Sequence, residues 1–186
     1  PFMRHRYGDK MNYGLTRIRH GKTMANEKRL YCGLTDIPLS KNGKKEINEK
    51  IKSGVYPASD GLYSSGMARC NETLALIYGK DIRFTEINNL KEIHLGAFEM
   101  KSFEELKAVK EYIGWINDKT GDYKCPGGES KNMFNMRVGL GLLSLCSRID
   151  QSGHLKPALV THGGVIVSIM ERIFPGNKSF YDWQPS

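Results

Sequence analysis

The sequence lacks the features that mark membrane-spanning, secreted and metal-binding proteins. No uninterrupted apolar run in its 186 residues is long enough to cross a membrane, and the N-terminal residues lack the apolar core of a signal peptide. The four cysteines, Cys32, Cys70, Cys125 and Cys146, form no CxxC pair and do not have the spacing of metal ligands. We therefore expect a cytoplasmic protein with reduced thiols, no membrane partner and no metal site.

Little in the sequence favours a nucleic-acid partner either. The formal net charge is +8, from 28 Lys and Arg against 20 Asp and Glu, but the lysines are scattered over predicted helices such as residues 41–52. A nucleic-acid surface would interleave basic and aromatic residues on one face. The excess of positive charge is instead consistent with solvated helix faces and with a small anionic substrate. The sequence leaves open whether the protein is a homo-oligomer.

The domain organisation is simple. With 39% hydrophobic and 26% charged residues, the chain has the composition of a globular protein, and it shows no internal repeat and no linker. Residues 1–10 lack apolar periodicity and do not begin with methionine, so we expect a tag or a disordered extension there. A single domain is expected over residues 11–186.

Strand patterns alternate with helix patterns along this domain. Strands are expected near residues 14–18, 60–65, 82–87 and 156–161, and helices at 41–53, around Arg69 to Tyr78, at 130–149 and at 165–174. Residues 90–99 are expected to be an extended loop, and 102–121 two short helices broken near Gly114. This alternation predicts an α/β fold with a mainly parallel sheet. The long helix is expected to bury these side chains: Met133, Met136, Val138, Leu142, Leu143 and Leu145.

Two histidines stand at equivalent points of this pattern. His20 and His162 each follow a predicted strand, and each is followed by glycine and the start of a helix. Because the carboxyl ends of parallel strands meet at one edge of a sheet, we expect these imidazoles to lie together, beside Arg19 and Arg69. Guanidinium groups bind phosphate oxygens in a bidentate manner. The sequence therefore predicts a pocket for a doubly charged anion such as phosphate.

These residues belong to five blocks that resemble, in order, those of the histidine phosphatase superfamily, over residues 14 to about 183. The blocks are Arg19-His20-Gly21 followed by Asn26, Arg29 and Gly33; Ser64-Ser65-Gly-Met-Ala-Arg69; Leu90-Lys-Glu92-Ile-His-Leu-Gly96; Pro126-Gly-Gly-Glu-Ser130; and Thr161-His162-Gly163-Gly164-Val165-Ile166. The resemblance implies a three-layer α/β/α fold of the phosphoglycerate-mutase-like type. Relatives continue with one more strand where this sequence stops at residues 181–186.

The resemblance also implies a metal-independent phosphohistidine mechanism without a cofactor. His20 would carry the phosphoryl group, while Arg19, Arg69 and His162 stabilise the charge on the oxygens. Glu92 matches the position of the proton donor to the leaving group. Asn26 and backbone N–H groups near Gly163 would add hydrogen bonds, with Cys32 and Gly33 also at the pocket.

The expected activity is a phosphomonoesterase acting on a small phosphate ester. Phosphoglycerate mutases of the family carry a long insertion that residues 93–125 are too few to form, so the chain resembles α-ribazole phosphatases and small broad-specificity phosphatases. Residues 93–128 would form a helical insert over the active site. A phosphoglycerate mutase and a non-catalytic phospho-ligand binding protein of the same fold are the alternatives. The roles of Lys22, Glu99 and Ser130 stay open.

Overall fold

A parallel sheet forms the centre of the protein. The computed structural model describes residues 13–175, so the expectations for residues 1–10 and 181–186 lie outside it. The strands lie in the order β1 (Thr16–Arg19), β4 (Pro157–Thr161), β2 (Gly61–Ser64) and β3 (Thr85–Glu86), and every pairing is parallel. The predicted sheet is confirmed, although the strand expected over residues 82–87 shortens to Thr85–Glu86.

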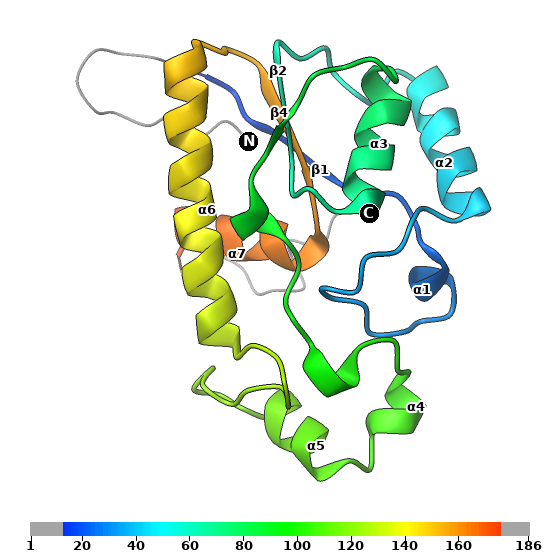
Figure 1. The fold of residues 1–186 in the computed structure, drawn as a ribbon, viewed down its shortest axis with the longest axis vertical. Coiled ribbons are helices and arrows are strands. Elements are labelled where there is room, and N and C mark those ends of the chain that lie inside the picture. The colour runs from blue at the N-terminus through cyan, green and yellow to red at the C-terminus, as the bar shows by residue number, and fades with distance from the viewer. Residues whose placement is uncertain (1–12, 176–186) are drawn as a thin grey trace.

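Strand β4 shows why the fold has three layers. All five of its residues are buried, so both faces of the sheet are covered. Leu159 packs into an apolar cluster with α6 (Lys131–Ser152) and α7 (Gly163–Ile173), whereas Ala158 and Val160 pack with α3 (Ala68–Tyr78) on the other face. Helix α2 (Lys41–Lys52) lies beside α3, and Figure 1 shows the two helix pairs on opposite sides of the strands.

Side-chain caps start several of the helices, among them α1 (Met24–Glu27), α2 and α6. The Thr23 and Asn26 side chains form a capping box for α1. Ser40 Oγ accepts from the backbone N–H of Gly43 at 2.9 Å to begin α2. Ser130 Oγ accepts from the N–H of Met133 at 3.2 Å, so Ser130 acts as the cap of α6.

The predicted core face of α6 is partly wrong. Val138, Leu142 and Leu145 are buried as expected, but Met133, Met136 and Leu143 are 42%, 70% and 65% exposed. Apolar residues occur on more than one side of this helix, and only one side faces the sheet. The buried side is completed by residues that the expectation omitted: Phe134, Gly141 and Ile149.

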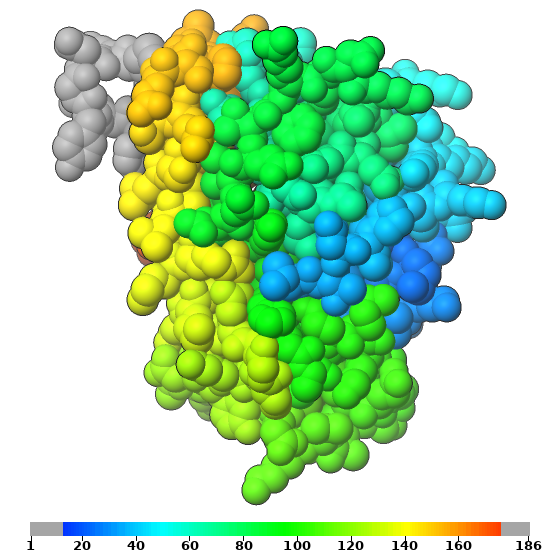
Figure 2. Space-filling model, in the orientation of Figure 1, coloured from blue at the N-terminus to red at the C-terminus, as the bar shows by residue number. Residues whose placement is uncertain are grey.

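Residues 95–125 build a separate apolar cluster beyond the end of the sheet. The 3₁₀ turn η1 (Asn88–Leu90) ends where the expected loop at 90–99 begins, and that loop contains a second turn, η2 (Gly96–Phe98). The break between α4 (Phe103–Leu106) and α5 (Lys110–Ile116) precedes Gly114. Gly114 lies inside α5, and the position needs glycine because a Cβ there would meet the Tyr123 ring at 2.7 Å. Figures 1 and 2 show this part at the lower end of the molecule.

This lower part is tied to the loop that follows α1. The backbone N–H of Tyr31 donates to the carbonyl of Lys101 at 2.8 Å, and Leu30 forms an isolated bridge with Ser102. Its own apolar side chains include Leu95, Phe98, Leu106, Tyr112 and Cys125. Within the described residues, no helix is both long and apolar enough to cross a membrane.

Candidate active site

Strand register brings the two histidines together. Arg19 at the end of β1 is level with Thr161 at the end of β4, and the backbone N–H of His20 donates to the Thr161 carbonyl at 3.0 Å. The next residue of each strand is therefore a histidine, at the same edge of the sheet. The His20 and His162 rings meet edge to face, with their centroids 5.2 Å apart.

The protonation of His20 follows from its contacts. Its Nδ1 lies 2.8 Å from the carbonyl oxygen of Gly21, which can only accept, so Nδ1 carries the hydrogen. Burial, together with the charges of Arg69 and Arg19, lowers the pKa of His20 to about 3, although the hydrogen bond to Gly21 acts in the opposite direction. At neutral pH the ring is uncharged, and the lone pair is on Nε2.

His162 is fully buried behind His20. Arg69 Nε donates to its Nδ1 at 3.3 Å, so the hydrogen of the neutral ring is on Nε2, which lies 2.9 Å from Ser65 Oγ. Burial and the Arg69 charge hold the pKa of His162 well below its usual range. Ser65 is a functional neighbour whose role the sequence did not indicate, because its partner lies on another strand.

The two arginines occupy different depths. Arg69 is 1% exposed; besides His162 it donates to the carbonyls of Gly33 at 2.7 Å and Thr35 at 2.8 Å. These contacts use three of its five N–H donors and leave two for a ligand. Arg19 is exposed and stands at the mouth of the site.

Glu92 approaches the site from a different part of the chain. Its Oε2 accepts from the N–H of Gly164 at 3.0 Å, and its Oε1 from the N–H of Ile93 at 3.0 Å. Burial raises the pKa of Glu92, although both N–H bonds and the charges of Arg69 and Arg19 oppose that rise. A Cβ on Gly164 would lie 2.5 Å from Glu92 Oε1, so this approach requires glycine.

These groups surround one pocket of about 170 Å³. It is lined by Arg19, His20, Thr23, Asn26, Cys32, Arg69, Glu92, Gly163, Gly164 and Val167. The expected residues Gly33 and His162 are absent from this lining: Gly33 supports Arg69 with its carbonyl, and His162 lies beneath the surface. Thr23, Gly164 and Val167 were not anticipated, although Gly164 belongs to the quoted motif around His162.

Asn26 and Cys32 contribute differently to the pocket wall. Asn26 Oδ1 accepts from the backbone N–H of Thr23 at 2.9 Å, which leaves its amide NH₂, a donor, for a ligand. Burial raises the pKa of the Cys32 thiol. A neutral thiol is a weak donor and a poor nucleophile, so Cys32 contributes to the shape of the pocket and adds no charge to it.

Glu99 and Lys22 lie outside the pocket lining. The Glu99 carboxylate accepts from the N–H groups of Gly33, Leu34, Thr35 and Leu95 at 2.8–3.3 Å. It thereby holds the loop whose carbonyls support Arg69. Lys22 forms an exposed ion pair with Glu46 at 2.7 Å.

The arrangement suits an anion. The pocket is lined by the His20 ring, two guanidinium groups, the Asn26 amide, the N-terminus of α7 and one carboxylic group, that of Glu92. Within residues 13–175, no three His, Cys, Asp or Glu side chains gather as a metal-ligand set. Chemically, a neutral imidazole nucleophile, cationic donors and a carboxyl group of raised pKa are the components of phosphoryl transfer.

Known proteins share this sequence pattern and fold. The pattern that defines the histidine phosphatase superfamily (branch 1) matches residues 15–184. Phosphoglycerate mutase-like protein 4 of Arabidopsis thaliana is 28% identical over 87% of this chain and 71% of its own length. Adenosylcobalamin/alpha-ribazole phosphatase of Salmonella typhimurium is 26% identical over 84% of this chain and 77% of its own length.

Solved structures agree with the fold. Bacillus stearothermophilus YhfR superimposes with a TM-score of 0.74 at 26% identity, covering 92% of this chain and 84% of that protein. The alpha-ribazole phosphatase of Shigella flexneri superimposes with a TM-score of 0.79 at 24% identity, over 92% and 85% of the two chains. The chain therefore belongs to the histidine phosphatase superfamily, branch 1, and is a phosphomonoesterase of that family.

Proposed function

We propose that the protein hydrolyses phosphate monoesters through a phosphohistidine on His20, without a metal ion. The observation that carries the proposal is the 2.8 Å hydrogen bond from Nδ1 of His20 to the Gly21 carbonyl. That bond fixes the tautomer, so the Nε2 lone pair of a neutral ring is available to attack phosphorus.

The reaction then has two balanced steps. In the first, the Nε2 lone pair forms the N–P bond while the ester P–O bond breaks, and the leaving alkoxide takes a proton from Glu92. In the second, the Glu92 carboxylate takes a proton from water as the oxygen attacks phosphorus, and the N–P electrons return to His20. The products are the alcohol and inorganic phosphate, and both side chains regain their initial states.

Cationic side chains supply the neutralisation that a metal ion supplies in other phosphoryl-transfer enzymes. Arg19 and the two remaining donors of Arg69 bind the oxygens, with the amide of Asn26 and backbone N–H groups near Gly163 as further donors. His162 joins them if its Nε2–H exchanges Ser65 for a phosphate oxygen. Loss of one such donor costs about 2.7–4 kcal/mol of transition-state stabilisation.

For the substrate we propose a small phosphorylated metabolite, with α-ribazole 5′-phosphate as the first compound to test. Relatives from Salmonella typhimurium and Escherichia coli at 26% and 27% identity bear the name adenosylcobalamin/alpha-ribazole phosphatase. The short segment between Glu92 and Pro126 supports a phosphatase over a mutase. The pocket volume of about 170 Å³ suits a phosphoryl group, with the rest of the ester outside.

The test combines a substrate panel with a trapping experiment. Phosphate release is measured from α-ribazole 5′-phosphate, 3-phosphoglycerate and p-nitrophenyl phosphate. Mixtures quenched in alkaline denaturant are searched for an acid-labile, base-stable phosphoryl group on the peptide that contains His20. His20→Asn should abolish both signals, whereas His154→Asn, a histidine that contacts Tyr63, should not.

Three outcomes would contradict the proposal. A phosphoryl label on serine would exclude the histidine intermediate. Efficient isomerisation of phosphoglycerate would show a mutase. Tight binding of phosphate esters with no turnover of any panel member would show a binding protein on the same fold.

A further inference from the structure

A buried ion pair outside the pocket contacts the segment that carries Glu92. Arg137 of α6 pairs with Glu129 through two bonds, Nε to Oε1 at 2.8 Å and Nη2 to Oε2 at 2.7 Å. Their side chains are 23% and 15% exposed, against 56% and 43% for the Lys22–Glu46 pair on the surface. A bidentate, mostly buried pair has a fixed geometry, which a surface lysine pair lacks.

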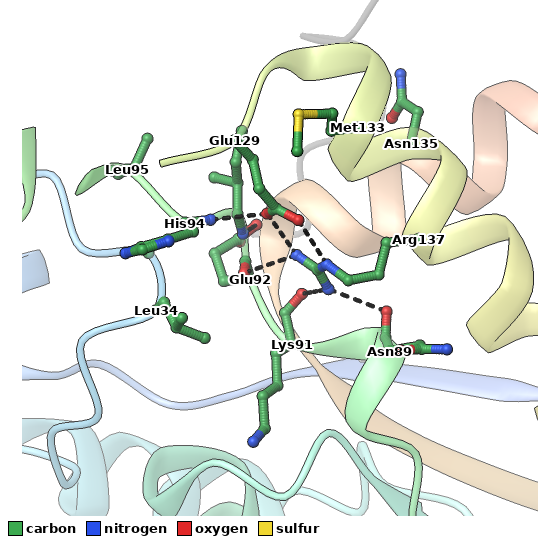
Figure 3. A network of polar contacts seen from close by, with 12 residues as sticks. Leu34, Asn89, Lys91, Glu92, His94, Leu95, Glu129, Met133, Asn135 and Arg137 are labelled. Atoms are coloured by element: carbon green, nitrogen blue, oxygen red, sulfur yellow. Dashed lines mark hydrogen bonds and ion pairs between the residues drawn. The ribbon is translucent and has the colours of Figure 1, made fainter. Parts of the chain in front are cut away.

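The same two side chains hold the backbone on both sides of Glu92. Arg137 Nη1 donates to the carbonyls of Asn89 at 3.1 Å and Lys91 at 2.9 Å, and Nη2 donates to the carbonyl of Glu92 at 3.1 Å. Glu129 Oε2 accepts from the N–H of His94 at 2.9 Å. Figure 3 shows the guanidinium group surrounded by these contacts.

Residues 92–94 lie between the turns η1 and η2 and belong to no helix or strand. One backbone bond holds them, from the N–H of Glu129 to the carbonyl of His94 at 2.8 Å, and the Arg137 and Glu129 side chains supply further contacts. The Glu92 carboxylate itself accepts from two backbone groups, the N–H of the adjacent Ile93 and the N–H of Gly164, each at 3.0 Å. A shift of the backbone at residue 92 would move the carboxylate with it.

We propose that Glu129 and Arg137 are positioning residues for Glu92: together they fix the backbone of residues 89–94 so that the carboxylate stands where it can protonate the leaving group. This inference rests on the proposed function, since it needs Glu92 to be the proton donor. A misplacement of about 1 Å at a reacting group can cost about 10²-fold in rate, so a pair that touches no substrate can still control the reaction.

Arginine is required by geometry and not by charge alone. Three backbone carbonyls and a carboxylate lie around one planar guanidinium group, which presents its donors in a rigid fork. A lysine at residue 137 keeps the positive charge for Glu129, but its single nitrogen has three donors and cannot reach all of these acceptors. Arg137→Lys therefore separates positioning from charge neutralisation.

The test compares two leaving groups in single-turnover phosphorylation of His20. An alkyl phosphate needs a proton on its leaving oxygen, and p-nitrophenyl phosphate does not. Glu92→Gln should lower the ratio of the alkyl rate to the nitrophenyl rate by about 10²–10⁴-fold. Arg137→Lys and Glu129→Gln should lower the same ratio by about 10- to 10²-fold.

The ratio distinguishes positioning from loss of folded protein. A variant that only unfolds part of the sample reduces both rates equally and leaves the ratio unchanged. The matched control is Arg172→Gln, because Arg172 also holds a backbone carbonyl of α6, that of Asn135 at 2.9 Å, but contacts nothing in residues 89–94. This control should keep the ratio of the unaltered protein.

The outcomes separate the two proposals. An unchanged ratio in Arg137→Lys and Glu129→Gln, with a lowered ratio in Glu92→Gln, would overturn the positioning role and leave the proposed function intact. An unchanged ratio in Glu92→Gln would overturn the assignment of Glu92 as proton donor, and the positioning role with it.

Discussion

The two histidines of the site, His162 buried and His20 partly buried, should make the protein lose stability as the pH falls through the range in which histidine normally titrates. His20 has a pKa of about 3 in the folded protein, and the value for an ordinary histidine is 6.5. Below pH 6.5 the unfolded chain therefore binds a proton that the folded chain does not bind, which favours unfolding. His162, whose pKa is also lowered, acts in the same direction.

The size of the effect follows from the two pKa values of His20. Its contribution is small at pH 7 and grows by about 1.4 kcal/mol for each pH unit below 6.5. Between pH 7 and pH 5, His20 alone should lower the free energy of unfolding by about 2 kcal/mol. That is a substantial part of the roughly 5–15 kcal/mol by which folded proteins are stable.

Urea unfolding at pH 7, 6 and 5 would measure this effect, with His20→Gln as the variant that removes the titrating group. The buffers must lack phosphate, because an anion that binds the folded state would stabilise it. The free energy of unfolding should fall by about 2 kcal/mol less in the variant than in the unaltered protein. An equal fall in both proteins would refute a neutral, buried His20 and remove the basis for its nucleophilic lone pair.

Three other results are expected. Gly164→Ala should displace the Glu92 carboxylate, since the new Cβ would lie 2.5 Å from Oε1, and slow alkyl phosphate hydrolysis by about 10²-fold; a rate within twofold would contradict the close approach. Glu99→Gln should lower the free energy of unfolding by about 1–3 kcal/mol, because one amide oxygen cannot replace a carboxylate that accepts from several N–H groups in and around residues 33–35. The control Glu104→Gln, at an exposed ion pair, should lower it by less than about 1 kcal/mol in the same urea titration. Exhaustive chelation should leave the rate of phosphate release unchanged, and a loss reversed by a divalent ion would contradict the metal-independent mechanism.

The strand ends were predictable because their signals are local. A short apolar run, then histidine and glycine, then a helix start occurs at both His20 and His162, and parallel strands must bring such ends to one edge. The caps at Thr23, Ser40 and Ser130 were predictable for the same reason, since each cap bonds an N–H only three residues away.

The supports of the site were not predictable, because each joins distant segments. Nothing near Glu99 indicates that its carboxylate binds the backbone of residues 33–35, and nothing near Ser65 indicates His162. The exposed face of α6 was misjudged for a related reason. Periodicity shows that a helix has apolar sides, but which side meets the sheet depends on strands elsewhere in the chain.

The pairing of β1 with β4 also determines when the sheet can form during synthesis and folding. Residue 16 pairs with residue 158, so β1 can join the sheet only after the residues between them have been synthesised. Contacts between residues so far apart in sequence form slowly, because a long loop must close first. The backbone N–H of His20, the proposed nucleophile, lacks its bond to the Thr161 carbonyl until β4 has been made. The rate at which activity returns during refolding should therefore report the rate at which β4 pairs with β1 and β2.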